Sequence, residues 1–201
     1  MTRPDLACAA TEVTRLLDGV RDDQLDGPTP CEGLTVAALL QHLLGLSQAF
    51  TDTARKTPPG PDAPRGGAST DVDLDPSWRT LLPPQLNELV AAWRDPAAWE
   101  GMATAGGVTM PADVMGVVAL DELVLHGWDL ARATGQEYSC DEASAGAVLE
   151  FTRMASAPEF ASSREGLFGP VVAVPADAST FEQALGFAGR DPAWRSSLER
   201  A

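Results

Sequence analysis

The sequence predicts an all-α protein built on a four-helix bundle. Apolar residues recur at helical spacing in several long stretches, and no convincing set of alternating strands is present. The two histidines of the 201-residue chain, His42 and His126, fall in its two most strongly helical stretches. Because bundles build sites from inward side chains on facing helices, these two stretches are where a site is expected.

Four helices are predicted for the core. The first runs from Asp5 to Val20 and the second from Thr35, a plausible N-cap, to about Arg55. A third, shorter helix is predicted from Pro83 to Arg94, because proline fits the first turn of a helix. The fourth runs from Pro111 to Thr134 and closes at Gly135, a candidate C-cap.

Two non-helical segments separate these helices. Thr57 to Ser77 is rich in Pro, Gly and Asp and reads as a long loop. Trp99 to Met110 is expected to be irregular, with a short strand at Val108 to Met110.

Beyond the fourth helix, the pattern predicts a C-terminal extension. A fifth helix is expected from Asp141 to Met154 and a last one from Ser179 to Gly186. The apolar, proline-bounded stretch Phe168 to Pro175 is expected to lie extended across the bundle. We interpret residues 1–201 as a single domain, with the core bundle at about 5–135 and the extension at 136–201.

The charge balance limits the partners. The chain has 29 acidic and 14 basic residues, a net charge of −15, which disfavours nucleic acid and anionic membranes. No apolar run reaches a membrane span, and Met1 to Ala10 lacks a signal pattern, so a cytoplasmic protein is predicted. The expected partner is a small-molecule substrate. Spare apolar surface on a bundle also allows a homodimer.

The cysteines do not indicate a metal site of their own. Cys8, Cys31 and Cys140 are odd in number, widely spaced and contain no CxxC pair. This argues against a disulfide framework and a cysteine-based zinc site, and favours free thiols.

A carboxylate and an imidazole share one face of the fourth helix. Glu122 and His126 are four residues apart, a spacing that can close on one divalent ion. We hypothesise that the fold brings His42 to them, so that the three hold a metal. Imidazole and carboxylate ligands suit zinc, and also nickel, iron or manganese. Three protein ligands leave open positions, as in catalytic zinc sites.

Each of these residues also has a simpler interpretation. Glu122 and His126 alone are a weak signal, and His42 taken alone is more typical of a core histidine with one hydrogen bond. Asp129 either orients a metal ligand or forms a surface ion pair with Arg132. Trp128 is interpreted as core or pocket lining.

Several motifs resemble a known family. Thr29–Val36 and Leu39–Leu43 resemble the entry to the second helix in the DinB-like metal-binding superfamily, in its actinobacterial branch related to the N-terminal domain of mycothiol-dependent maleylpyruvate isomerase. Glu122–Gly135 resembles that branch's other signature and is the most specific part. Phe168–Pro170 and Gly189–Pro192 are similar to the ends of its short, single-domain members.

The resemblance implies a four-helix bundle holding a divalent metal, zinc or nickel, on His42, Glu122 and His126. It also implies that the metal activates a low-molecular-weight thiol, such as mycothiol, for isomerisation or S-transfer of a small electrophile. Trp128, residues of the long loop and Phe168 are expected to line the cavity above the metal.

Two departures qualify the resemblance. Leu34 stands where the family usually has Trp, and the chain is expected to be too short for the additional C-terminal domain of the isomerase. Three hypotheses follow: a thiol-activating metalloenzyme, a non-catalytic metal-binding, stress or sensor protein, and a helical protein whose histidines only pack.

Overall fold

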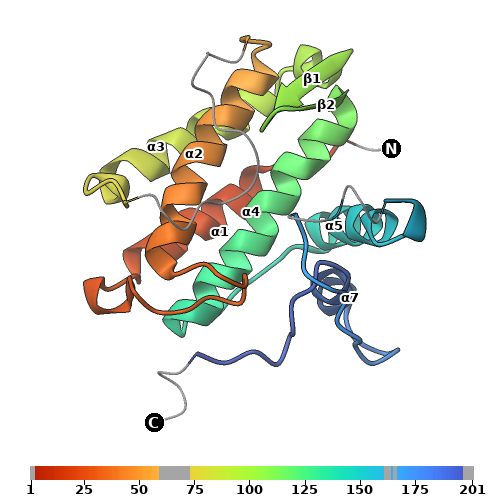
Figure 1. Ribbon diagram of the computed structural model, residues 1–201. Helices are drawn as coiled ribbons and strands as arrows, with labels where there is room; N and C mark the ends of the chain where they lie inside the picture. The colour runs from red at the N-terminus through yellow and green to blue at the C-terminus, as the bar shows by residue number, and fades with distance from the viewer. Residues whose placement is uncertain (1–2, 59–72, 161–163, 165–166, 197–201) are drawn as a thin grey trace.

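The structure is a computed structural model that describes residues 3–58, 73–160, 164 and 167–196. Four helices form its core (Figure 1): α1 (Ala7–Asp18), α2 (Val36–Ala54), α3 (Trp78–Trp93) and α4 (Ala112–Thr134). Each packs on two others, since α1 contacts α3 and α4, and α2 contacts the same two helices. The predicted all-α class and four-helix bundle are confirmed.

The interior of the bundle is apolar because each helix presents a leucine-rich face to it. Leu16, Leu39, Leu89 and Leu123, one from each core helix, are fully buried. Burying such side chains supplies most of the stability of helices of this length. The side chains that emerge into this core from α2 and α4 are therefore held in fixed positions.

The third helix begins earlier than predicted. It starts at Trp78, and Pro83 and Pro84 lie inside it rather than in its first turn. Each proline removes a hydrogen bond to the carbonyl four residues earlier, on Arg79 and Thr80. Both of those residues are exposed, so water can satisfy the two carbonyls. Burial of Trp78 anchors the first turn.

A β-hairpin precedes α4, where only one short strand was predicted. Strand β1 (Met102–Ala105) pairs with β2 (Val108–Pro111) in antiparallel register. Gly106 and Gly107 form the two-residue connection with positive φ values of 56° and 81°, which glycine tolerates best. The Gly-Gly pair was the sequence signal for this hairpin.

The C-terminal region packs to one side of α4 (Figure 1). Helix α5 (Glu142–Ala155) contacts α4, and α7 (Thr180–Phe187) contacts α5. The extended stretch 168–175 lies against α7 rather than across the bundle, since the Val172 amide donates to the Gly186 carbonyl at 2.9 Å. Three short 3-10 helices complete the described elements: η1 (Asp22–Gln24), η2 (Pro96–Trp99) and η3 (Pro158–Phe160).

Within the described ranges, none of the helices has the length and apolar character needed to cross a membrane.

Candidate metal centre

The structure brings His42, Glu122 and His126 together. Thr35 caps α2 by accepting a hydrogen bond from the Ala38 amide, and His42 follows two turns later. Glu122 and His126 lie one turn apart on α4. The Nε2 atoms of His42 and His126 lie 3.2 and 3.1 Å from the same carboxylate oxygen, Oε2 of Glu122.

Close helix packing fixes the ring of His126. Gly127 lets α1 approach α4 directly beside it, because a Cβ at Gly127 would lie 3.1 Å from a methyl group of Val13. The rings of His42 and His126 meet edge to face, with centroids 4.9 Å apart. The two imidazoles therefore reach one point from two different helices.

Asp129 contacts the other ring nitrogen of His126, Nδ1, and Arg190 in turn contacts Asp129. Nδ1 of His126 lies 3.0 Å from Oδ2 of Asp129, and Nη2 of Arg190 lies 3.0 Å from the same oxygen. Both Asp129 and Arg190 are buried. Asp129 therefore contacts His126, and its ionic partner is the buried Arg190 rather than Arg132 at the surface.

Charge pairing sets the protonation of the cluster. Burial disfavours the charged form of His126, but hydrogen bonds to Asp129 and Glu122 overcome it and raise the pKa to about 9. Burial likewise opposes ionisation of Glu122, yet the two histidines hold its pKa well below the usual value. Burial also opposes ionisation of Asp129, and the charge of Arg190 together with the His126 hydrogen bond lowers its pKa.

An ionised Asp129 can only accept hydrogen bonds, so Nδ1 of His126 must carry a proton. A neutral His126 then presents its lone pair on Nε2, the nitrogen that faces Glu122.

These donors suit a divalent metal. The ligand atoms of the three residues all lie within 4.8 Å of one another. In a tetrahedral zinc site with bonds of about 2.0–2.1 Å, neighbouring ligand atoms are about 3.3 Å apart. The two nitrogen–oxygen separations of 3.1 and 3.2 Å are close to this ligand-to-ligand distance. Two of the three ligand-to-ligand distances that such an ion needs are therefore already present.

Cys31, His126 and Asp129 form a second group with ligand atoms at this spacing. This group suits a metal less well. Burial raises the pKa of Cys31 to about 11, so its thiol stays protonated. The oxygens of Asp129 are already engaged by Arg190.

The triad lies in a cavity of about 360 Å³. Phe168 lines it, whereas Trp128 does not and is buried in the core, the other position considered for it. Trp128 is two residues after His126, and side chains two residues apart on a helix point about 200° away from each other, so Trp128 points away from His126. Most of the long loop expected here, residues 59–72, lies outside the described residues.

One further acid of this cavity was not expected. Asp121 is buried and lines the cavity beside Glu122, and its Oδ1 has no hydrogen-bond partner within the described part of the chain. Burial, followed by the charge of Glu122, raises its pKa well above the usual value.

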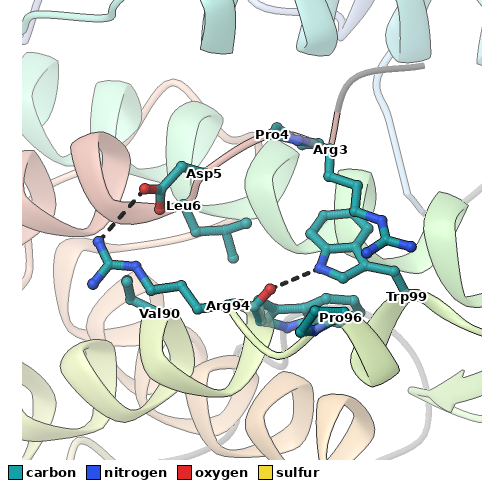
Figure 2. Close-up of a pocket in the computed structure, with 9 residues that line it drawn as sticks. Arg3, Pro4, Asp5, Leu6, Val90, Arg94, Pro96 and Trp99 are labelled. Atoms are coloured by element: carbon teal, nitrogen blue, oxygen red, sulfur yellow. Dashed lines mark hydrogen bonds and ion pairs between the residues drawn. The ribbon is translucent and has the colours of Figure 1, made fainter.

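Another cavity, of about 200 Å³, lies where residues 3–6 meet α3 and η2 (Figure 2). Arg94 pairs with Asp5 there at 3.5 Å, and both side chains are exposed. Trp99 donates to the Trp93 carbonyl at 2.7 Å. None of the predicted site residues lines it.

Sequence reasoning did not assign a role to Arg190. It stands after Gly189 in a turn far from α4 along the chain, and nothing in its spacing connects it to Asp129. The available signals were the resemblance of Gly189–Pro192 to family members and the need of a buried Asp129 for a cation.

Fold and geometry together describe a helical-bundle protein with two imidazoles and a carboxylate converging in a cavity. The family model of the mycothiol maleylpyruvate isomerase N-terminal domain matches residues 6–131. The chain belongs to this family, and the prediction of a DinB-like member is confirmed.

Relatives agree with this placement. Two uncharacterized proteins of Mycobacterium tuberculosis, from strains CDC 1551 / Oshkosh and H37Rv, are each 30% identical over 156 residues, which is 72% of this chain and 74% of theirs.

Solved structures share the fold. A crystal structure of the mycothiol-dependent maleylpyruvate isomerase superposes with a TM-score of 0.64 and 18% identity, over 96% of this chain and 90% of that chain. A histidine-to-alanine mutant of that enzyme gives a TM-score of 0.55 at 18% identity, over 73% of this chain and 66% of that chain. The match that covers 96% of this chain includes the C-terminal extension as well as the bundle, so this chain shares a larger part of the isomerase fold than the sequence predicted.

Proposed function

We propose that the protein is a metal-dependent enzyme that activates a low-molecular-weight thiol, of the mycothiol type, for isomerisation or S-transfer of a small electrophile. The observation that carries this is the convergence of two imidazole nitrogens on one carboxylate oxygen in an open-sided cavity. Family membership and the likeness in fold to a mycothiol-dependent isomerase support it.

His42, Glu122 and His126 would hold the ion, with zinc as the first choice and nickel as the alternative. A divalent ion bound there supplies a Lewis acid that lowers the pKa of a coordinated thiol. Three protein ligands leave room for such a thiol, since a closed structural site would need a fourth.

The surrounding residues set up this chemistry. Asp129 keeps the proton of His126 on Nδ1 and so directs the Nε2 lone pair to the ion. Arg190 neutralises Asp129 and holds it in place. The apolar side chains that line the cavity lower the local dielectric constant, which strengthens electrostatic interactions inside.

The first test is metal content of protein purified without chelator and without a histidine tag. Wild type is expected to hold about one zinc or nickel ion per chain. Glu122→Gln keeps the shape but removes the charge and is expected to lose the ion. Glu88→Gln is the matched control, because Glu88 lies on the exposed surface of α3 and pairs with Arg55, away from the triad.

Metal-loaded protein is then assayed with mycothiol and maleylpyruvate or another small electrophile. Thiol-dependent turnover that Glu122→Gln abolishes supports the enzyme. Stoichiometric metal without turnover for any thiol would favour the non-catalytic metal-binding protein instead. Absence of metal after zinc and nickel addition would overturn the proposal.

A further inference from the structure

The triad cavity lies along α4, and its lining comes from α2, α4, α5, the hairpin and the segment around Phe168. Helices α2 and α5 both pack on α4, one on each side of it in Figure 1. At about 360 Å³, the cavity lies in the range of small-molecule sites. The walls contributed by α2 and by α5 differ in the side chains they present.

The α2 wall carries very small side chains next to His42. His42, Gly45 and Ala49 follow one another at spacings of three and four residues, so they share one face of α2, and all three line the cavity. A Cβ added to Gly45 would meet no atom within 4 Å among the described residues outside its own stretch of helix. Gly45 is also exposed, so the backbone of α2 is accessible one turn from His42.

Helix packing does not account for a glycine at this position. Glycine is among the least favourable residues in a helix interior, and it is usually found where another group comes close to the backbone. At Gly116 and Gly127 of α4 that group is a side chain, because a Cβ would overlap the ring of Trp99 or press on Val13. Gly45 has no such neighbour in the described structure, and the space it leaves open belongs to the cavity.

The wall across α4 from Gly45 is aromatic. Phe151 of α5 and Phe168 meet edge to face with ring centroids 6.2 Å apart, and both are half-buried cavity residues. Rings prefer such edge-to-face or offset contacts with further rings. Met110 of the hairpin, also half-buried in the lining, adds a thioether, which contacts aromatic rings favourably.

We infer that Gly45 and Ala49, together with Phe151 and Phe168, form a subsite for an aromatic ring of the ligand, and that the size of the side chain at position 45 determines which ligands enter. As a statement of substrate class this rests on the proposed function: the electrophile carries an aromatic ring. As a binding preference it depends on the cavity alone and can be measured separately.

The first test is calorimetric binding to zinc-loaded and metal-free protein, with metal content measured on the same samples. The probes are 4-phenyl-1-butanol and its saturated counterpart 4-cyclohexyl-1-butanol, which has the thicker ring. We expect the phenyl compound to bind at least about threefold more tightly, as contacts between aromatic rings predict. Equal or tighter binding of the cyclohexyl compound would overturn the inference.

Variants at glycine locate the subsite. Gly45→Leu places a side chain in the open space and is expected to weaken the phenyl compound at least about tenfold. It should also raise the melting temperature by about 2–4 °C, because leucine favours the helix more than glycine does. Gly146→Leu is the matched control, since Gly146 of α5 has the same open space at its Cβ but lies outside the cavity lining. It should bind the probe like wild type.

Weaker binding by a more stable protein cannot result from unfolding. Gly45→Ala, with an expected loss of about threefold, replaces Gly45→Leu if that variant does not fold. Phe151→Leu is expected to abolish the preference for the phenyl over the cyclohexyl compound. Unchanged binding in the Gly45 variant, equal weakening by Gly146→Leu, or an unchanged preference in Phe151→Leu would overturn the assignment.

The two proposals fail separately. Absence of bound metal, with ring binding by metal-free protein that still depends on Gly45, contradicts only the proposed function. Stoichiometric metal with ring binding that is indifferent to Gly45→Leu contradicts only the aromatic subsite.

Discussion

The two cavities both carry charged side chains, yet they differ in how these are held. In the cavity beside the N-terminal segment, Arg94 and Asp5 pair at 3.5 Å with more than half of each side chain exposed. In the triad cavity, His126 and Asp129 pair at 3.0 Å and are buried. Solvent screens the first pair, whereas the second interacts in a low-dielectric interior.

The two cavities therefore differ in how their charged groups are buried and paired, and the presence of charge alone does not define a site in this molecule. An exposed ion pair adds little energy, because water screens its charges. Buried charged groups need charged or hydrogen-bonding partners that the surrounding packing holds in place, and their pKa values shift strongly. The four predictions below separate the two cavities, in order of expected effect.

His42→Ala removes one nitrogen ligand of the triad. We expect metal affinity to fall by more than about 100-fold, because loss of a direct ligand exceeds the 10–100-fold effect of an outer partner. Competition with a chromogenic chelator measures this. Arg94→Gln is the control from the other cavity and should bind metal like wild type. Retained affinity in His42→Ala would remove His42 from the ligand set.

Arg190→Gln removes one of the two cationic partners of buried Asp129 and leaves protonated His126 as the other. Removing one partner of a buried pair costs about 3–5 kcal/mol, so we expect the free energy of unfolding to fall by that amount. Urea denaturation of metal-free protein measures it. The double variant Arg190→Gln with Asp129→Asn should recover part of the loss. A change below about 1 kcal/mol would show that Asp129 does not depend on Arg190.

The pH dependence of stability follows from His126. Its folded pKa of about 9 lies above the ordinary 6.5. The stability it contributes to metal-free protein is therefore complete below about pH 6.5 and is lost as pH rises through about 9, an effect on the order of 3 kcal/mol. Metal affinity should rise over the same window, since the ion competes with the proton on Nε2.

Thermal melts across this range, with and without zinc, test the assignment. The metal-free protein should lose stability toward pH 9, and the His126→Gln variant should not show that loss. A flat profile in metal-free wild type would contradict the paired, charged state of His126.

Asp5→Asn breaks the exposed pair of the other cavity. We expect the free energy of unfolding to change by no more than about 0.5 kcal/mol, because exposed pairs contribute little. Urea denaturation in low and high salt measures it. A loss as large as that of Arg190→Gln would mean that the two cavities are not different in kind.

The sequence anticipated the features that depend on local spacing. Apolar periodicity located α1, α2 and α4, and the spacing of Glu122 and His126 placed both on one helical face. The prediction that His42 joins Glu122 and His126 rested on the presence of only two histidines in the sequence and on the family motifs. The start of α3 was misplaced, because tolerance of proline inside a helix depends on neighbouring elements. The choice between core and pocket for Trp128 was left open by the sequence, and the structure places it in the core.

The sequence alone was sufficient for the bundle and for placing Glu122 and His126 on one helical face, because helical periodicity and spacing act within one segment of chain, and the family motifs added His42 to this pair. Only the tertiary structure decided the rest. It placed Arg190 on Asp129, left the Oδ1 of Asp121 without a hydrogen-bond partner among the described residues and surrounded the triad with apolar side chains. These features arise from packing between segments far apart in the chain, where burial determines which charges must pair.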